Sequence, residues 1–431
     1  MSDLPTELTT VVAAAAPLTE RFAEAGHRLF LVGGVVRDHL LDRRRADADL
    51  DATTAARPEE IKAIVAPIAE AVWTQGERFG TIGCQIDGQP WEITTFRAES
   101  YDDDSRKPTV AFGDDIADDL ARRDFTVNAM AVATDTAELV DPYGGRTDLE
   151  ASVLRTPLDP EVSFSEDPLR MLRAARFHAG YALAPTPELE ASITSLLDRI
   201  AIVSIERVRD ELQKLLLVDD PGPGLDLLDR TGLLERVVPG LVSIESERPS
   251  LDLLARRVAA VDADPAMRWA ALLSGGAVTP GDLRALRFAG SLAADTLWFH
   301  SAPLATTKSG MRPGGLAAVR RAAAAAPSGR RLEDQLDYAR AIRVVNVWPN
   351  GPLGAVEREL ADLREAEPDL DDPTPVLSGQ DVCELLEIAP GPDVGRALAW
   401  LRDLRFERGP VGADEAGRRL AAWWSIRDLP D

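Results

Sequence analysis

The stretch that decides the fold is Leu31-Val-Gly-Gly-Val-Val-Arg-Asp-His-Leu-Leu41, which is followed closely by Asp47-Ala-Asp-Leu-Asp51. The first segment predicts a strand that ends near residue 32, a turn at Gly33-Gly34 and a helix from about residue 35. Two glycines let backbone N–H groups approach an anion, and a helix N-terminus adds a favourable dipole. The turn is therefore predicted to bind phosphate.

The second segment alternates carboxylates with small or apolar residues. On a strand, residues two apart share a face, so Asp49 and Asp51 are predicted to point the same way. Two hard oxygen ligands side by side suit Mg²⁺, which keeps its other positions for water and substrate phosphate. A glycine turn alone is commonly only a turn, and an acidic run alone is commonly solvated surface. Together they favour metal-dependent phosphoryl chemistry.

Length and composition limit the possible classes of protein. The 431 residues leave room for two or three domains. No run reaches the roughly 18 apolar residues of a membrane span, so we expect no membrane segment. The two cysteines, Cys84 and Cys383, lack metal-ligand spacing, which fits a reduced cytoplasm. The net charge of −24 argues against a uniform nucleic-acid-binding surface, although it permits a local basic track.

Further polar residues follow the acidic segment. Residues 80–86 and 91–96 are predicted to form a strand pair joined through Asp87-Gly88. Glu92 then lies on a strand, either as a third carboxylate beside the first two or as an exposed strand position. Downstream, the segment Arg122–Asn128 offers hydrogen-bond donors to phosphate, ribose or base.

Beyond about residue 150 the strand signals nearly vanish and helical patterns follow one another. Residues 165–177 are predicted to open with a helix cap and continue as a helix. One polar stripe recurs every three residues: Asp167, Arg170, Arg173 and Arg176. Such a stripe is either a solvated helix face or an Asp–Arg pair that bonds a base edge, since arginine donates and aspartate accepts.

One region is basic although the chain is acidic. Residues 305–345 hold eight basic and three acidic side chains, a local balance of +5. This segment, which begins at Lys308 and includes Arg312, is the best candidate for a phosphate-backbone track, with ordinary surface as the alternative. The arginines singled out for RNA binding are Arg320, Arg321, Arg330 and Arg331.

Taken in order, these motifs resemble the class II tRNA nucleotidyltransferase and bacterial poly(A) polymerase family. The eight-residue segment Arg122–Ala129 is the most specific match and the glycine pair the least. By this resemblance Asp49 and Asp51 are the metal ligands, and Asp47 is an additional aspartate upstream of them. The resembling segments are Gly33–Asp38, Asp49–Glu60, Glu92–Arg97, Arg122–Ala129, Asp141–Gly145, Glu166–Arg176, 377–382 and 390–395.

The resemblance implies an α+β fold. The head, residues 1–150, would be a polymerase-β-like nucleotidyltransferase domain with a mixed sheet. An all-α neck over residues 151–245 would recognise the nucleotide, and a helical body and tail over residues 246–431 would bind RNA. Relatives often carry a His-Asp phosphohydrolase motif in the middle helices. Here Ser274-Gly275 stand at that place, so we expect no second hydrolytic activity.

The resemblance also implies roles for individual residues. Asp49 and Asp51 would hold two Mg²⁺ ions, and Glu92 would orient or deprotonate the attacking hydroxyl. Asp167 and Arg170 would act as the amino-acid template for the incoming base. The residues expected to bind the nucleotide are Gly33, Gly34, Arg37, Arg123, Asp124, Asn128, Asp167, Arg170, Arg173 and Arg176.

The implied reaction is attack of an RNA 3′-hydroxyl on the α-phosphate of a nucleoside triphosphate, with pyrophosphate leaving. The favoured substrates are tRNA, CTP and ATP, which give the CCA end. One alternative is a poly(A) polymerase that adds only A to general RNA. The alternative of another class is a catalytically silent RNA- or nucleotide-binding protein on the same scaffold.

Overall fold

The computed structural model describes residues 8–43, 49–98, 111–239, 250–306 and 315–426. The chain divides into two compact units. The first comprises Met1–Leu215 and Pro223–Pro239, and the second comprises Leu216–Gly222 and Gly240–Asp431. The division near residue 240 lies close to the boundary expected at 245. Head and neck, expected as separate domains, belong to one unit.

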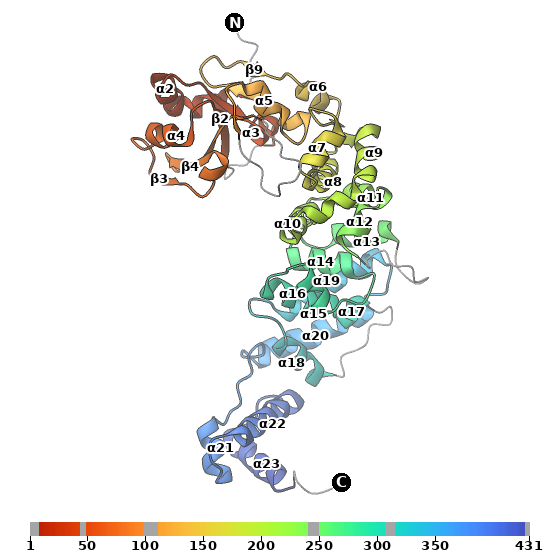
Figure 1. The fold of residues 1–431 in the computed structure, drawn as a ribbon. Helices are drawn as coiled ribbons and strands as arrows, with labels where there is room; N and C mark the ends of the chain where they lie inside the picture. Colours follow the sequence, from red (N-terminus) through yellow and green to blue (C-terminus); the bar gives the residue numbers. More distant parts are fainter. Residues whose placement is uncertain (1–7, 44–48, 99–110, 240–249, 307–314, 427–431) are drawn as a thin grey trace. The chain divides into compact units, whose positions relative to one another are not determined.

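The head is built on a seven-stranded mixed sheet (Figure 1). β2 and β5 run parallel, and the other neighbouring strands pair antiparallel. The strands, in spatial order, are β3 (Ala71–Trp73), β4 (Thr81–Ile86), β5 (Gln89–Thr95), β2 (Leu50–Thr54), β1 (Leu29–Val32), β8 (Ala131–Ala133) and β9 (Leu139–Val140).

Local sequence explains the central strand β1 and the β4–β5 hairpin of this sheet. The apolar run of β1 is buried at every position, as expected for a central strand covered on both faces. The predicted hairpin forms between β4 and β5, and both of its turn residues, Asp87 and Gly88, have positive φ. Helices α2 (Ala16–Glu24) and α4 (Pro58–Val65) contact each other and the sheet, while α3 (Gly34–Leu40) contacts β1 and β2.

The remaining head elements complete this layer. The other helices and short strands are α1 (Thr9–Ala14), α2 (Ala16–Glu24), α3 (Gly34–Leu40), α4 (Pro58–Val65), η2 (Glu77–Phe79), β6 (Arg97–Ala98), β7 (Ala111–Phe112), α5 (Ile116–Ala121), η3 (Thr126–Asn128) and α6 (Gly145–Glu150). A buried cluster that includes Phe30, Phe96 and Leu120 ties β1 to the chain after β5.

The neck is mainly helical, with one departure from the expected all-α structure. β10 and β11 form a two-stranded parallel pair, held by bonds from Ala184 N to Ser152 O (2.7 Å) and Thr186 N to Leu154 O (3.2 Å). The elements are β10 (Val153–Leu154), α7 (Pro160–Glu166), α8 (Leu169–Tyr181), β11 (Ala184–Pro185), α9 (Pro187–Ser195), η4 (Leu197–Ile202), α10 (Ile205–Leu216), α11 (Gly222–Arg230) and α12 (Leu233–Val237).

The helix predicted over residues 165–177 also begins later than expected. Ser165 and Glu166 end the preceding helix α7, and α8 starts at Leu169. Pro168, which lacks an N–H group, stands at the N-cap of α8. Asp167 supplies the cap instead, since its Oδ1 accepts from the backbone N of Leu169 at 3.2 Å. The break therefore places Asp167 at a corner between two helices.

The described part of the second unit contains helices without strands. Its interior includes α14, which is buried from Ala266 to Leu273, and Ser274 caps that helix where the His-Asp motif of relatives was expected. The helices are α13 (Leu251–Ala260), α14 (Pro265–Leu273), α15 (Pro280–Ala285), α16 (Gly290–His300), α17 (Pro303–Thr306), α18 (Leu316–Ala324), α19 (Leu332–Val345), α20 (Gly351–Ala366), α21 (Gly379–Leu386), α22 (Pro392–Arg408) and α23 (Ala413–Ile426).

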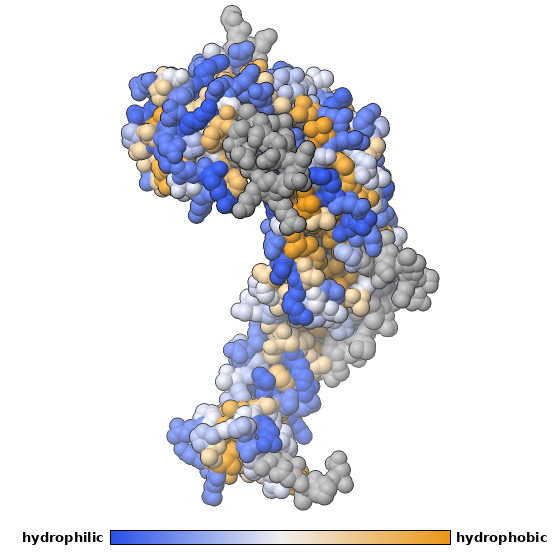
Figure 2. Space-filling view, in the orientation of Figure 1, coloured by the Kyte–Doolittle hydropathy of each residue, from blue (hydrophilic) through white to orange (hydrophobic). Residues whose placement is uncertain are grey.

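The visible surface mixes hydrophilic and hydrophobic residues. Figure 2 shows orange hydrophobic patches among blue residues over the neck, where Leu158, Val162 and Ile202 are exposed. Isolated exposed apolar side chains are normal on protein surfaces. Within the described ranges, none of the helices has the length and apolar character that crossing a bilayer requires.

Candidate active site

The predicted glycine turn lies between β1 and α3, as the sequence indicated. Gly33 has φ of +68°, a conformation that side-chain-bearing residues rarely adopt. A Cβ atom at this position would lie 2.7 Å from Nη1 of Arg123. Gly33 thus allows the Arg123 guanidinium to pack directly against the turn. Gly34 follows as the first residue of α3.

Arg37, predicted to hold triphosphate, is buried beside the neck helix α8. Its Nε donates to Asp38 Oδ1 at 2.8 Å, its Nη2 donates to the hydroxyl of Tyr181 at 2.6 Å, and its Nη1 donates to Asn128 Oδ1. The guanidinium also lies over the rings of Tyr181 and Phe177. These contacts occupy its donors within the protein, so they favour a positioning role for Arg37 over direct phosphate contact.

The carboxylates predicted to be catalytic lie on or next to the parallel strands β2 and β5. Asp49 precedes β2, Asp51 lies on β2, and Glu92 on β5 is the direct cross-strand neighbour of Asp51. Burial raises the pKa of Asp51 to about 6; Arg123 opposes this shift, and Glu92 and Asp49 reinforce it. Glu92 is an exposed strand residue and also lies beside Asp51, so its position fits both of the interpretations that the sequence left open. Asp47 lies outside the described residues.

A divalent cation fits this arrangement on electrostatic grounds. The charged form of Asp51 is disfavoured by burial and by two neighbouring carboxylates, and a bound cation would offset that cost. The side-chain carboxylates of Asp49, Asp51 and Glu92 make no hydrogen bond or ion pair with any described residue. In the described ranges, no three Asp, Glu, His or Cys side chains gather closely enough to hold a metal ion. Two carboxylates would leave positions for water and substrate phosphate.

Arg123 connects the carboxylates with a second group of residues. It forms an ion pair with Asp119, with Nη2 3.3 Å from Oδ2, and its buried Nε has no hydrogen-bond partner among the described residues. Its neighbour Asp124 accepts from Nδ2 of Asn128 at 2.8 Å and from Nε of Arg173 at 2.8 Å. Burial alone would raise the pKa of Asp124, but Arg173 and Asn128 hold it below its usual range.

A polar pocket of about 260 Å³ brings together five of the ten residues predicted to bind the nucleotide. Arg170 stands at its wall, where Nη1 donates to Ser163 Oγ at 2.7 Å and Nη2 donates to the carbonyl oxygen of Arg122. This second bond joins the neck to the head segment that was the most specific motif. The residues that line the pocket are Arg123, Asp124, Asp167, Leu169, Arg170, Arg173 and Arg207.

The polar stripe of α8 is not the solvated face that its pattern permitted. Helix α10 packs charged side chains against it: Arg207 lies 3.2 Å from Asp167, and the buried Glu211 pairs with Arg176. Glu211 also lies 4.0 Å from Arg173. Arg176 is therefore tied to Glu211 and does not line the pocket. Sequence reasoning missed Arg207 and Glu211, although their spacing of four residues on a predicted helix placed them on one face.

The arginines predicted to bind RNA form ion pairs with acidic side chains of the second unit. Arg320 is buried and pairs with Glu367 at 2.8 Å, and Arg321 pairs with Glu407 at 2.7 Å. Arg330 contacts Asp264 and Asp295 at 2.9 and 2.7 Å, and Arg331 lies 3.5 Å from Asp371. These ion pairs neutralise the local excess of positive charge, so they do not support a phosphate track. Lys308 and Arg312 lie outside the described residues.

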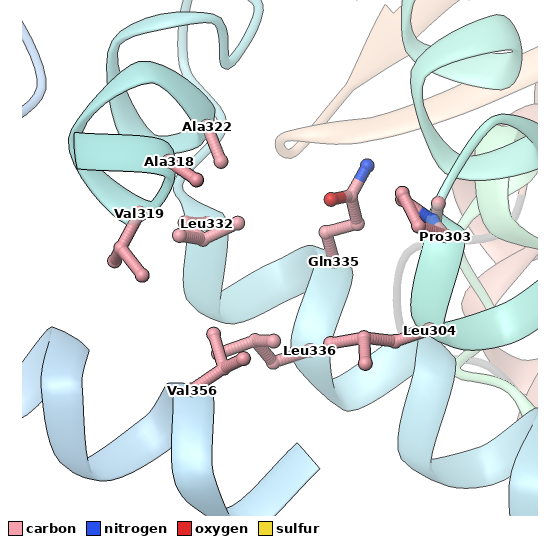
Figure 3. Close-up of a pocket in the computed structure, with 10 residues that line it drawn as sticks. Pro303, Leu304, Ala318, Val319, Ala322, Leu332, Gln335, Leu336 and Val356 are labelled. Carbon is pink, nitrogen blue, oxygen red and sulfur yellow. The ribbon is translucent and has the colours of Figure 1, made fainter. Parts of the chain in front are cut away.

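A second pocket, of about 210 Å³, lies in the second unit and is apolar (Figure 3). Its only polar lining residue is Gln335, whose amide nitrogen donates to Trp298 O at 2.7 Å. A triphosphate requires charged or hydrogen-bonding partners, and this wall has almost none. The apolar lining residues include Pro303, Leu304, Val319, Leu332, Leu336 and Val356. Of these two pockets, only the polar one in the first unit offers charged partners for a triphosphate.

Paired carboxylates on a mixed sheet, beside a glycine turn and an arginine-rich pocket, define a nucleotidyltransferase head. Comparison with protein families agrees. Residues 29–155 match the poly A polymerase head domain, and residues 183–244 match a segment described as the probable RNA and SrmB-binding site of polymerase A.

Curated relatives give the same assignment. The chain is 38% identical over 236 residues to the CCA-adding enzyme of Lactobacillus gasseri, which is 54% of this chain and 57% of that protein. It is 36% identical over 267 residues to the CCA-adding enzyme of Bacillus subtilis, covering 60% of this chain and 63% of that one. The matched regions thus span less than two thirds of these relatives.

Similarity to solved structures extends over nearly the whole chain. The Bacillus stearothermophilus CCA-adding enzyme in complex with CTP is 26% identical, with a TM-score of 0.75 over 98% of this chain and 99% of that one. The Thermotoga maritima CCA-adding enzyme complexed with tRNA shares the fold, with a TM-score of 0.60 at 18% identity. In its head sequence and in its fold, the chain is similar to enzymes of the tRNA nucleotidyltransferase and poly(A) polymerase family. Enzymes of this kind generally use Mg²⁺.

Proposed function

We propose that the protein adds C and A to the 3′ end of tRNA, using CTP and ATP and releasing pyrophosphate. The observation that carries this proposal is the polar pocket, which gathers Asp167 and Arg170 beside Arg123. Cytosine and adenine each present an amino donor next to a ring-nitrogen acceptor. Uracil and guanine present a carbonyl acceptor next to an N–H donor. One carboxylate acceptor and one guanidinium donor therefore favour the first pair of bases and reject the second.

The head residues supply the chemistry of transfer. Two Mg²⁺ ions, when bound by Asp49 and Asp51, would lower the pKa of the RNA 3′-hydroxyl and neutralise the leaving pyrophosphate. Glu92, directly beside Asp51, is placed to orient or accept the proton of that hydroxyl. Arg123 binds the triphosphate or ribose through donors that include its unpartnered Nε. Arg37 keeps Asn128 and the neck in place behind the site.

RNA contact is expected along the segment that matches the RNA-binding family model. Residues 183–244 include Lys214 and Arg236, whose side chains are 62% and 54% exposed. Phosphate contacts of such residues position an RNA without reading its sequence. This segment is favoured over Arg320, Arg321, Arg330 and Arg331 because the RNA-binding family model matches it. Acidic partners do not distinguish the two sets, since Lys214 lies 4.0 Å from Glu211 and Arg236 pairs with Asp198 at 2.7 Å.

Incubating the purified protein with tRNA that lacks its terminal residues, with Mg²⁺ and with CTP or ATP, tests the proposal. Incorporation of CTP and then ATP is the expected result. Addition of ATP alone to any RNA would identify a poly(A) polymerase. The match of residues 29–155 to a poly A polymerase head domain favours this alternative. Failure of both nucleotides would identify a silent binding protein and refute the proposal.

A further inference from the structure

Arg207 lines the polar pocket and contacts a residue proposed to read the base. It lies near the start of α10, and its Nη2 donates to Oδ2 of Asp167 at 3.2 Å. The side chains of Arg207 and Asp167 are 55% and 35% exposed, respectively. Arg207 is therefore not part of the hydrophobic interior, and its loss would not open a cavity.

The two carboxylate oxygens of Asp167 are held from different directions. Oδ1 accepts from the backbone N of Leu169 at 3.2 Å, and Oδ2 accepts from Arg207. Each oxygen of an ionised carboxylate has two lone-pair directions, so each retains one for a ligand. A carboxylate held at both ends loses rotational freedom before the ligand arrives, which lowers the entropic cost of binding.

We propose that Arg207 is a positioning residue for base selection: it fixes the Asp167 carboxylate so that this group accepts a hydrogen bond from the amino group of cytosine or adenine. This inference rests on the proposed function. An ionised carboxylate accepts hydrogen bonds and donates none, so the direction of its free lone pairs decides which donor of a base it can meet. Arg207 thus acts on the orientation of Asp167.

Two residues of α10, Arg207 and Glu211, have different contacts, which distinguish positioning of Asp167 from stabilisation of the neck. Glu211, one turn later, is 3% exposed and holds Arg173 and Arg176, so it stabilises the packing of α10 against α8. Arg207 is exposed and pairs only at the pocket rim. Replacing Arg207 should therefore leave the fold intact and change nucleotide recognition.

A double-mutant cycle tests the inference through nucleotide binding, which needs no turnover. Calorimetry compares CTP and UTP binding by the full chain, by Arg207→Gln, by Asp167→Asn and by the double variant. We expect Arg207→Gln to weaken CTP binding about two- to fivefold, the size typical of a partly exposed ion pair, and to leave UTP binding unchanged. In the Asp167→Asn background it should have no further effect, and Arg207→Lys should restore part of the discrimination.

Arg230→Gln is the matched control. Arg230 is another neck arginine, which pairs with Glu190 and Asp226 and does not line the pocket, so both nucleotides should bind this variant as they bind the parent. Equal losses for CTP and UTP would mean that Arg207 contacts the triphosphate, and would overturn the inference. An undiminished effect in the Asp167→Asn background would overturn it too. If the parent protein binds CTP in preference to UTP but does not add C and A to tRNA, only the proposed function is refuted.

Discussion

A single methyl group added at Gly33 is expected to displace the Arg123 guanidinium from the nucleotide site. The Cβ atom of Gly33→Ala would lie 2.7 Å from Arg123 Nη1, and ordinary contact begins at 3.4 Å, so the guanidinium must withdraw by about 0.7 Å. Misplacing a catalytic contact by about 1 Å can cost about 100-fold in rate. We therefore expect kcat/KM for CTP to fall by about 10- to 100-fold.

Backbone strain contributes separately to this variant. Alanine at φ of +68° and ψ of −128°, a sparsely populated backbone region, adds roughly 1–3 kcal/mol, which lowers stability without reference to Arg123. Gly88→Ala is the comparison variant for strain at positive φ. Gly88 has φ of +74° in the β4–β5 hairpin, and a Cβ atom there would have nothing within 4 Å. Both variants should therefore lower the thermal midpoint of the head, whereas only Gly33→Ala should impair nucleotide addition.

The assay pairs steady-state addition of CTP to tRNA with thermal unfolding of each variant. Equal losses of kcat/KM in Gly33→Ala and Gly88→Ala would show that strain alone accounts for the damage. Wild-type activity in Gly33→Ala would mean that Arg123 does not need its position against the turn. Either result would contradict the assignment of Arg123 to the triphosphate or ribose.

Further predictions concern the carboxylates, the base pocket and the buried ion pairs. Asp51→Asn should reduce addition at least about 100-fold and leave RNA binding intact. The raised pKa of Asp51, about 6, means that its charged form destabilises the folded state. Above pH 6, Asp51→Asn should therefore unfold at a higher temperature than the parent. This difference in unfolding temperature should disappear as the pH falls toward 4. Arg170→Ala should raise KM for CTP and ATP and allow UTP or GTP to be added. Competition among the four triphosphates measures this selectivity, and unchanged selectivity would contradict the template role of Arg170. Arg320→Ala should destabilise the second unit by about 3 kcal/mol, because it leaves Glu367 buried with a more distant partner, Arg405, at 3.4 Å. The salt dependence of tRNA binding by Arg320→Ala should match that of the parent, and a shallower slope would restore the phosphate-track hypothesis.

The head could be predicted from local sequence because its decisive features lie within short segments. The apolar run before Gly33 and the Asp87-Gly88 turn each predict one conformation, and the structure contains both. The strand predicted through Asp49 and Asp51 begins at Leu50, so Asp51 lies on it and Asp49 precedes it. The start of α8 was predicted less well. Ser165 and Glu166 satisfy a capping pattern, yet they continue α7, and Asp167 and Pro168 make the break. Two adjacent helices compete for the same residues there, and tertiary packing decides.

The basic segment shows why charge counted along a sequence misleads. Arg320, Arg321 and Arg331 find their acidic partners at Glu367, Glu407 and Asp371, which lie 40 or more residues later. A window over residues 305–345 contains these cations without those anions, so it overstates the positive charge around the three arginines in the folded unit. Sequence position alone does not place such distant partners together.

The arginines of the base pocket also have acidic partners. Its lining contains four arginines: Arg123 pairs with Asp119, Arg170 lies 3.5 Å from Glu166, Arg173 pairs with Asp124, and Arg207 pairs with Asp167. Arg123 nevertheless keeps a buried Nε that has no hydrogen-bond partner among the described residues. Arg123 also opposes the rise in the pKa of Asp51, which links the pocket electrostatically to the carboxylates. Moving Arg123 should therefore weaken triphosphate binding and raise the pKa of Asp51 together.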